Sequence, residues 1–242
     1  MKPAQTLQKI AAPESWEKIP WGNLYKETLN TALSPWWSKI FGFHLLKVGA
    51  LSIEIDSEEC TIPHQVNMCP ALGRAHVVAD PYQLPFAEKS IDACLLAHTL
   101  SYSADPHRVL REIDRVLISD GWLIISGFNP ISLVGMGKLL PGVRRRQPYC
   151  SRMFSQMRVI DWLSLLNYEV VHHDSLHVLP WRHQERGVWR NHLPLLGCIN
   201  VLIVRKRTIP LTITPSKTLF RKSSLRRPLG ATKSYHQSHQ SG

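Results

Sequence analysis

Residues 77–126 read VVADPYQLPFAEKSIDACLLAHTLSYSADPHRVLREIDRVLISDGWLIIS, and this stretch decides the fold. Within it, residues 91–96 read IDACLL, a run that is apolar except for Asp92 and that ends just before Ala97 and His98. A short apolar run of this kind is typical of a strand at the centre of a parallel sheet, where both faces are buried.

The clearest helix of the chain follows this strand. Asp105 is suited to cap it, Pro106 fits its first turn, and apolar residues recur at helical spacing from Val109 to Leu117. The Ser-Asp-Gly turn at 119–121 predicts the end of the helix, and residues 122–126 predict the next strand. Strand, helix and strand in so few residues predict a right-handed parallel unit, and therefore an α/β fold.

The sequence on either side adds further elements. Strands are predicted at residues 44–48, 64–68, 75–79, 168–173 and 199–205, and a helix at residues 158–166. Gly49 marks a turn after the first of these strands, and Asn167 can end the helix in a left-handed conformation. The chain is long enough for one such domain with appendages.

Residues 1–43 are expected to form an N-terminal helical part. It is rich in Trp and Pro from residue 13 onward, and a short helix is predicted from Asn23 to Ala32. This part either packs as a layer on the domain or covers a substrate pocket as a lid, and the sequence leaves both open.

The net charge of +11 is concentrated at the C-terminal end. Nine Lys and Arg and no acidic residue occur from Arg205 onward, so residues 1–204 keep 20 basic and 18 acidic side chains. The polar composition of residues 207–242 predicts a disordered basic tail. The basic clusters at 144–146 and 221–227 are either solvated or attach weakly to nucleic acid or an anionic membrane.

Other global features indicate a cytoplasmic protein. The five cysteines are scattered without a C-x-x-C pair, which fits a reducing compartment. The opening MKPAQTLQK is followed by AAPESWEK rather than an apolar region, so no secretory signal is expected. No apolar stretch is long enough to span a membrane.

Several motifs in residues 77–126 stand in a fixed order. They are an acid after the third strand, a Leu-Pro-Phe turn, an Ile-Asp pair, an Asp-Pro helix start, an Arg-Val-Leu helix end and a Gly turn. In this order and spacing the segment resembles class I S-adenosylmethionine-dependent methyltransferases of the type 11 group. The resemblance continues more weakly through residues 127–130 and 161–171, where the chain is similar to a bacterial subgroup of uncharacterised methyltransferases, and in all it covers residues 40–206.

The resemblance implies that residues 44–206 are a methyltransferase domain. Its fold would be a Rossmann-like three-layer sandwich, with a mostly parallel sheet of seven strands or fewer and an antiparallel last strand. The cofactor S-adenosylmethionine would lie across the carboxyl ends of the strands. Six residues are expected to contact it: Val48, Gly49, Asp80, Pro81, Ala97 and His98.

These residues would play different parts. Gly49 lets the backbone approach the cofactor. Asp80 either accepts a hydrogen bond from the adenine amino group, as the matching acid does in the family, or only caps a turn. His98 lies beside the methyl donor, where it either lines the pocket or acts catalytically as a general base.

The first strand and its turn depart from the family pattern. Lys47 stands where the family has an acid, and Leu51 stands where it has a further glycine. Asn67 is a weak substitute for the carboxylate that holds the ribose. Pro81 lacks the N–H that often bonds to adenine.

Two other kinds of site are disfavoured. His172, His173 and His177 have no Cys or carboxylate partner at ligand spacing, and neighbouring strand residues face opposite ways, so no metal site is expected. A nicotinamide-dependent dehydrogenase requires G-x-G-x-x-G after the first strand, and this motif is absent.

Two hypotheses of function remain. The first is a methyltransferase that uses S-adenosylmethionine and a small-molecule acceptor. The second is a non-catalytic methyltransferase-like binding module whose basic tail associates with nucleic acid or a membrane surface.

Overall fold

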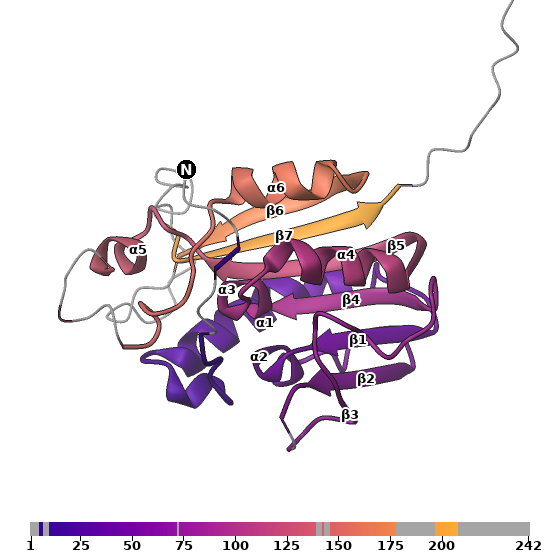
Figure 1. Ribbon diagram of the computed structural model, residues 1–242, viewed down its shortest axis with the longest axis horizontal. Coiled ribbons are helices and arrows are strands. Elements are labelled where there is room, and N and C mark those ends of the chain that lie inside the picture. Colours follow the sequence, from indigo (N-terminus) through magenta and orange to yellow (C-terminus); the bar gives the residue numbers. More distant parts are fainter. Residues whose placement is uncertain are drawn as a thin grey trace, which may run out of the picture. The chain divides into compact units, whose positions relative to one another are not determined.

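A seven-stranded sheet with the order β3-β2-β1-β4-β5-β7-β6 forms the centre of the structure (Figure 1). The strands are β1 (His44–Val48), β2 (His64–Cys69), β3 (Val77–Val78), β4 (Ile91–Ala97), β5 (Leu117–Phe128), β6 (Tyr168–Leu176) and β7 (Ile199–Lys206). Neighbouring strands among β1 to β5 pair in parallel, whereas β7 pairs antiparallel with both β5 and β6. This confirms the predicted Rossmann-like sheet with an antiparallel last strand.

The structure is a computed structural model that describes residues 5–6, 10–71, 73–138, 142, 146–177 and 197–207. It divides into one unit that ends at Thr208 and a second unit from Ile209. The tail predicted to be disordered, except for Arg207, lies outside the described residues, as do two of the three arginines at 144–146.

Seven helical elements are described. They are the 3-10 helix η1 (Trp16–Lys18) and the helices α1 (Gly22–Trp37), α2 (Ala50–Ile53), α3 (Thr99–Tyr102), α4 (Pro106–Val116), α5 (Leu133–Gly137) and α6 (Gln156–Ser164). None of the helices in the described ranges is long and apolar enough to cross a membrane.

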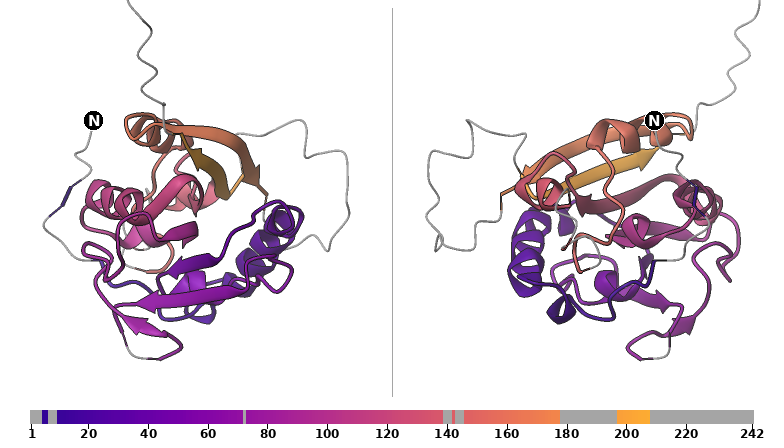
Figure 2. Two further views of the ribbon diagram at one scale, coloured as in Figure 1. Left: turned by 90° about the vertical axis from the view of Figure 1, so that its right-hand side faces the viewer. Right: turned by 60° about the vertical axis from the view of Figure 1, so that its left-hand side comes forward.

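Helices cover both faces of the sheet. The apolar side of α1, with Tyr25, Leu29 and Leu33, belongs to one buried cluster, and the apolar sides of α4 and α6 belong to another. Figure 2 shows α1 and α4 on opposite sides of the strands. The three layers agree with the predicted sandwich, and α1 packs directly on the sheet.

The first helix is longer than the prediction for residues 23–32. It continues to Trp37 through Pro35, because Leu33 and Trp37 extend its buried side. Pro35 does not stop it, although a proline lacks the N–H that would bond to the carbonyl four residues earlier, and the helix ends two residues later.

Strand β5 also differs from its prediction. It begins at Leu117 rather than at residue 122, so the expected turn at 119–121 lies inside the strand. Asp120 takes a left-handed conformation with φ 62°, and the pairing with β4 shifts register near this point. The turn signal therefore marks an irregularity in the strand rather than its start.

Candidate functional site

The candidate site lies at the carboxyl edge of the sheet, which we define as the residues that directly follow β1 to β5. β1 pairs with β2 on one side and with β4 on the other, so the strand order reverses between β1 and β4. Ligands of open parallel sheets bind at such a reversal. In Figure 1 the arrowheads of β1, β2 and β4 point left, and the indigo N-terminal ribbon lies on that side.

The turn after β1 is built around Gly49. Its φ of 94° is a conformation that favours glycine, and a Cβ at this position would lie 3.1 Å from Thr99 Oγ1. Gly49 N–H donates to the Met68 carbonyl over 2.8 Å, and α2 begins at the next residue. The chain therefore turns tightly here, and a single glycine suffices for it.

Two hydroxyls join the ends of β1 and β4. Ser52 Oγ and Thr99 Oγ1 each donate to the Val48 carbonyl over 2.6 Å. Ser52 Oγ also accepts a bond from Ala97 N–H over 2.8 Å. The structure thus brings Val48, Gly49 and Ala97 together, as the sequence analysis expected, through two residues that the analysis missed.

His98, directly after β4, is fully buried. Its ring packs against Phe128 at 4.3 Å and edge-on against Trp16 at 5.1 Å between ring centroids. Neither ring nitrogen has a hydrogen-bond partner among the described residues, and burial lowers the pKa of His98 to about 3. Such an imidazole is neutral at pH 7 and a poor proton acceptor, so this environment fits a wall of the site better than a general base.

Asp80 and Pro81 lie at the same edge, after β3. Asp80 is exposed, and its Oδ1 accepts a bond from Tyr82 N–H over 2.9 Å. The carboxylate therefore shapes a turn, as the alternative interpretation held, and it remains open to solvent. No described contact joins it to the β1–β4 pair.

Tyr82 fixes this turn to the loop that precedes α4. Its hydroxyl accepts a bond from Ala104 N–H over 2.6 Å and lies 2.9 Å from Ser103 Oγ. No pattern in the sequence predicts this contact, because Tyr82 shares no motif with the loop.

Lys47, which replaces the family's acid, faces inward. The residue is 6% exposed, and its Nζ donates to the Ile55 carbonyl over 2.8 Å. Burial lowers the pKa of this ammonium. Lys47 therefore stabilises the chain after α2 and does not reproduce the role of a carboxylate.

Trp16 contacts both α2, which follows β1, and His98, which follows β4. It has no exposed surface, and its Nε1 donates to the Leu51 carbonyl over 3.0 Å while its ring contacts His98. By residue type, the glycine at 49, the carboxylate at 80 and the small residue at 97 suit a nucleoside cofactor. In this arrangement, however, the indole and Leu51 leave no room for S-adenosylmethionine between these two segments, so the cofactor does not fit there.

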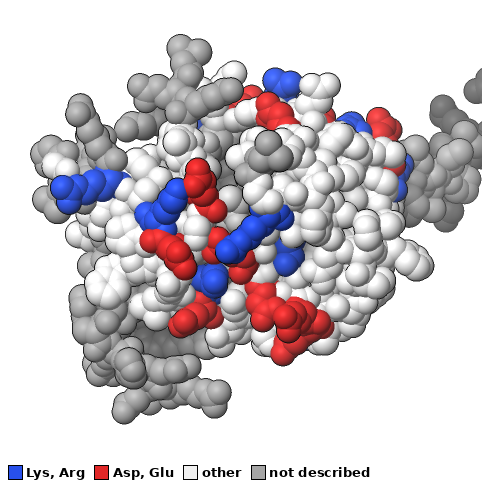
Figure 3. All heavy atoms as spheres, turned by 90° about the horizontal axis from the view of Figure 1, so that it is seen from below, with Lys and Arg blue, Asp and Glu red and all other residues white. Residues whose placement is uncertain are grey.

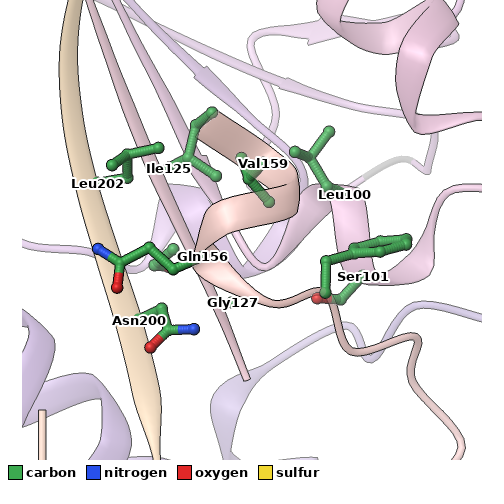
Figure 4. A pocket seen from close by; sticks show the side chains of 10 residues that line it. Leu100, Ser101, Ile125, Gly127, Gln156, Val159, Asn200 and Leu202 are labelled. Carbon is green, nitrogen blue, oxygen red and sulfur yellow. The ribbon is translucent and has the colours of Figure 1, made fainter. Parts of the chain in front are cut away.

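A small cavity of about 30 Å³ lies between α3, β5, β7 and α6 (Figure 4). Leu100, Ile125, Val159 and Leu202 form its apolar wall, and Ser101, Gln156 and Asn200 add polar groups. This volume holds only one or two water molecules. The cavity is therefore too small for a cofactor.

Charges on the described surface are mixed. On the face in Figure 3, Lys and Arg side chains alternate with Asp and Glu. Glu54, for example, lies 3.6 Å from Arg74 and 4.0 Å from Lys26. Within the described ranges, no group of three or more His, Cys, Asp or Glu could hold a metal ion, and His172 instead stacks on Trp36 at 4.9 Å.

Comparisons with known proteins agree with the fold. The sequence profile of the type 11 methyltransferase domain matches residues 46–125. The chain is 54% identical to the uncharacterised protein YafS of Escherichia coli K12 over 233 residues, which cover 96% of this chain and 97% of that protein.

Solved structures share the fold at low sequence identity. A methyltransferase of Thermotoga maritima, described as a possible histamine N-methyltransferase, is 17% identical with a TM-score of 0.56, covering 77% of this chain and 93% of that one. An S-adenosylmethionine-dependent methyltransferase of Archaeoglobus fulgidus is 15% identical with a TM-score of 0.53, covering 75% and 94%. The chain thus belongs to the type 11 group of class I S-adenosylmethionine-dependent methyltransferases, within a bacterial subgroup that includes YafS.

Proposed function

We propose that this chain transfers the methyl group of S-adenosylmethionine to a small-molecule acceptor. The observation that carries the proposal is the tight Gly49 turn beside the end of β4, at the reversal of strand order in a methyltransferase fold. Bound S-adenosylmethionine supplies an electrophilic methyl group, so the protein contributes mainly by positioning the reactants and excluding water.

The roles of the residues follow from their places. Val48 and Gly49 would let the backbone approach the cofactor closely, since Gly49 has no side chain, and the exposed carboxylate of Asp80 would accept a bond from the adenine amino group. Pro81 would contribute only apolar contact, since it has no N–H. Ala97 and His98 would form the wall beside the methyl donor.

A small acceptor is favoured over a nucleic acid by the charges on the face of the molecule that Figure 3 shows. Phosphate backbones bind to tracks of positive charge. The face in Figure 3 instead alternates both signs.

Calorimetric titration with S-adenosylmethionine tests the proposal. The wild type should bind the cofactor at millimolar concentration or below, and Asp80→Ala should weaken binding about tenfold, since a hydrogen bond to a charged group contributes about 1.5 to 3 kcal/mol. Asp161→Ala, an exposed carboxylate on α6, serves as the control and should bind like the wild type. Absence of binding at millimolar cofactor, both by the wild type and by a variant that lacks the Trp16 indole, would reject the proposal.

The alternative is a methyltransferase-like binding module without catalysis. The inward-facing Lys47 and the buried Trp16 favour it, because both occupy places that a cofactor site would use. Incubation with labelled S-adenosylmethionine and a pool of metabolites separates the two. Transfer of label to any metabolite by the wild type, together with its absence in the Gly49→Val variant, would exclude the non-catalytic alternative.

A further inference from the structure

We propose that Trp16 is a plug on the carboxyl edge, and that the N-terminal segment, residues 10–21, must move outward before S-adenosylmethionine can bind. The inference rests on the proposed function, because it takes S-adenosylmethionine as the ligand of this edge. It explains why the cofactor does not fit the described arrangement: the N-terminal segment of the chain itself closes the site.

The position of the indole carries the first part of the argument. Trp16 bonds to the Leu51 carbonyl, just after β1, and contacts the ring of His98, just after β4. These are the segments that follow the two strands at the reversal of strand order, where a ligand of such a sheet lies. The indole and the ligand therefore compete for one space.

His98 gives an independent reason to expect a ligand there. A fully buried polar group without a hydrogen bond is costly, and native structures rarely contain one. Both ring nitrogens of His98 are buried and have no hydrogen-bond partner among the described residues. The ring of Trp16 is one of the two aromatic rings that pack against this imidazole. When the indole leaves, polar atoms of a ligand can bond to the exposed imidazole.

The connection to α1 is built like a hinge. Trp21, the residue before α1, takes a left-handed conformation with φ 63°, is 59% exposed and makes no side-chain cap bond. A bulky residue in this conformation is strained, so the chain gains by relaxing it. The 3-10 helix η1 has only three residues and adds little resistance.

Gly22 is needed for the closed position. A Cβ on this residue would lie 1.7 Å from the Trp16 carbonyl oxygen, which is a backbone atom and cannot simply rotate away. Alanine at position 22 would still suit the first turn of α1. Gly22→Ala should therefore displace Trp16 while it leaves the indole and the helix present.

The test compares cofactor binding by the full-length wild type with that of Trp16→Ala, Gly22→Ala and Trp16→Phe, by calorimetry with S-adenosylmethionine. If the open form is a minor population, Trp16→Ala and Gly22→Ala should bind about tenfold more tightly, since apparent affinity scales with the fraction of open molecules. Trp16→Phe keeps an aromatic ring in place and should stay close to the wild type.

Trp37→Ala is the matched control, because Trp37 is also buried in the same apolar cluster but lies at the far end of α1. It should lose stability without a gain in affinity. If the wild type binds at least as tightly as both Trp16→Ala and Gly22→Ala, the plug is wrong and the proposed function stands. If none of the proteins binds at millimolar cofactor, both proposals fall.

Hydrogen exchange gives a second readout, which does not depend on any variant. The amides of Ile19 and Gly22 donate to the carbonyls of Trp16 and Ile19 in the closed arrangement. With saturating S-adenosylmethionine their exchange should become faster if the segment is displaced. Slower exchange would mean that Trp16 lines the bound cofactor, and this result would overturn the proposal.

Discussion

At the scale of the residue, burial decides what His98 contributes. The imidazole lies among aromatic rings, and its pKa is lowered to about 3 because the charged form is desolvated there. The unfolded chain would titrate near the ordinary value of 6.5. Below pH 6.5 the unfolded state therefore takes up a proton that the folded state does not, and acid favours unfolding.

His98→Asn tests this consequence. The contribution of the neutral, buried His98 to the free energy of unfolding is fully present above pH 6.5 and is lost as the pH falls toward 3. Between pH 7 and pH 5 this loss is about 2 kcal/mol. Asparagine tolerates the left-handed backbone at this position and does not titrate. Urea unfolding at both pH values should show a smaller loss of stability in the variant, and equal losses would contradict the burial of a neutral imidazole.

Single residues also mark the limit of the sequence analysis. Gly49 and His98 were located correctly at the carboxyl edge, because strand ends can be predicted from apolar runs. Trp16 was assigned only to a helical layer or lid, since its partners Leu51 and His98 are distant in sequence and no local pattern joins them. Whether the six expected residues contact a cofactor stays a prediction.

At the scale of the element, local sequence signals predicted whether a segment is a helix or a strand better than they predicted where it begins and ends. α4 begins where Asp105 and Pro106 indicated, and Asp105 Oδ1 accepts a bond from Arg108 N–H over 3.1 Å. β5 was misjudged at its start: Asp120 does take a left-handed conformation, but the strand already begins at Leu117, and regular pairing with β4 and β7 starts only at Trp122. A turn signal can thus mark an irregularity inside a strand, and the sequence alone does not show that the strand begins before it.

Asp105→Ala should destabilise the protein by about 1 kcal/mol, because the first turn of α4 loses its cap. Thermal unfolding of the variant checks this value. Asp161→Ala, which removes an exposed carboxylate of α6, should change the unfolding temperature much less. Equal effects of the two substitutions would mean that Asp105 contributes no cap.

At the scale of the whole molecule, the excess positive charge and the folded unit lie in different parts of the chain. The described unit has both signs mixed on the face in Figure 3, whereas residues 208–242 contain six Lys and Arg and no acidic residue. Any binding to a polyanion should therefore depend on the tail rather than on the methyltransferase fold.

Removal of residues 208–242 tests this division. The shortened chain should keep the unfolding temperature and cofactor affinity of the full chain, and it should elute from a heparin column at lower salt. Unchanged elution would show that the tail makes no such contact. A large fall in unfolding temperature would show that the tail contributes to the folded unit.

The antiparallel strand β7 also has a consequence for synthesis of the protein. It is the last strand in the described part of the chain, yet it lies between β5 and β6 and pairs with both. On the ribosome, the edge of β5 stays open until residues 199–206 have emerged, and an open strand edge can pair with other chains. Premature termination before this point would therefore yield a product prone to aggregation rather than a smaller folded protein.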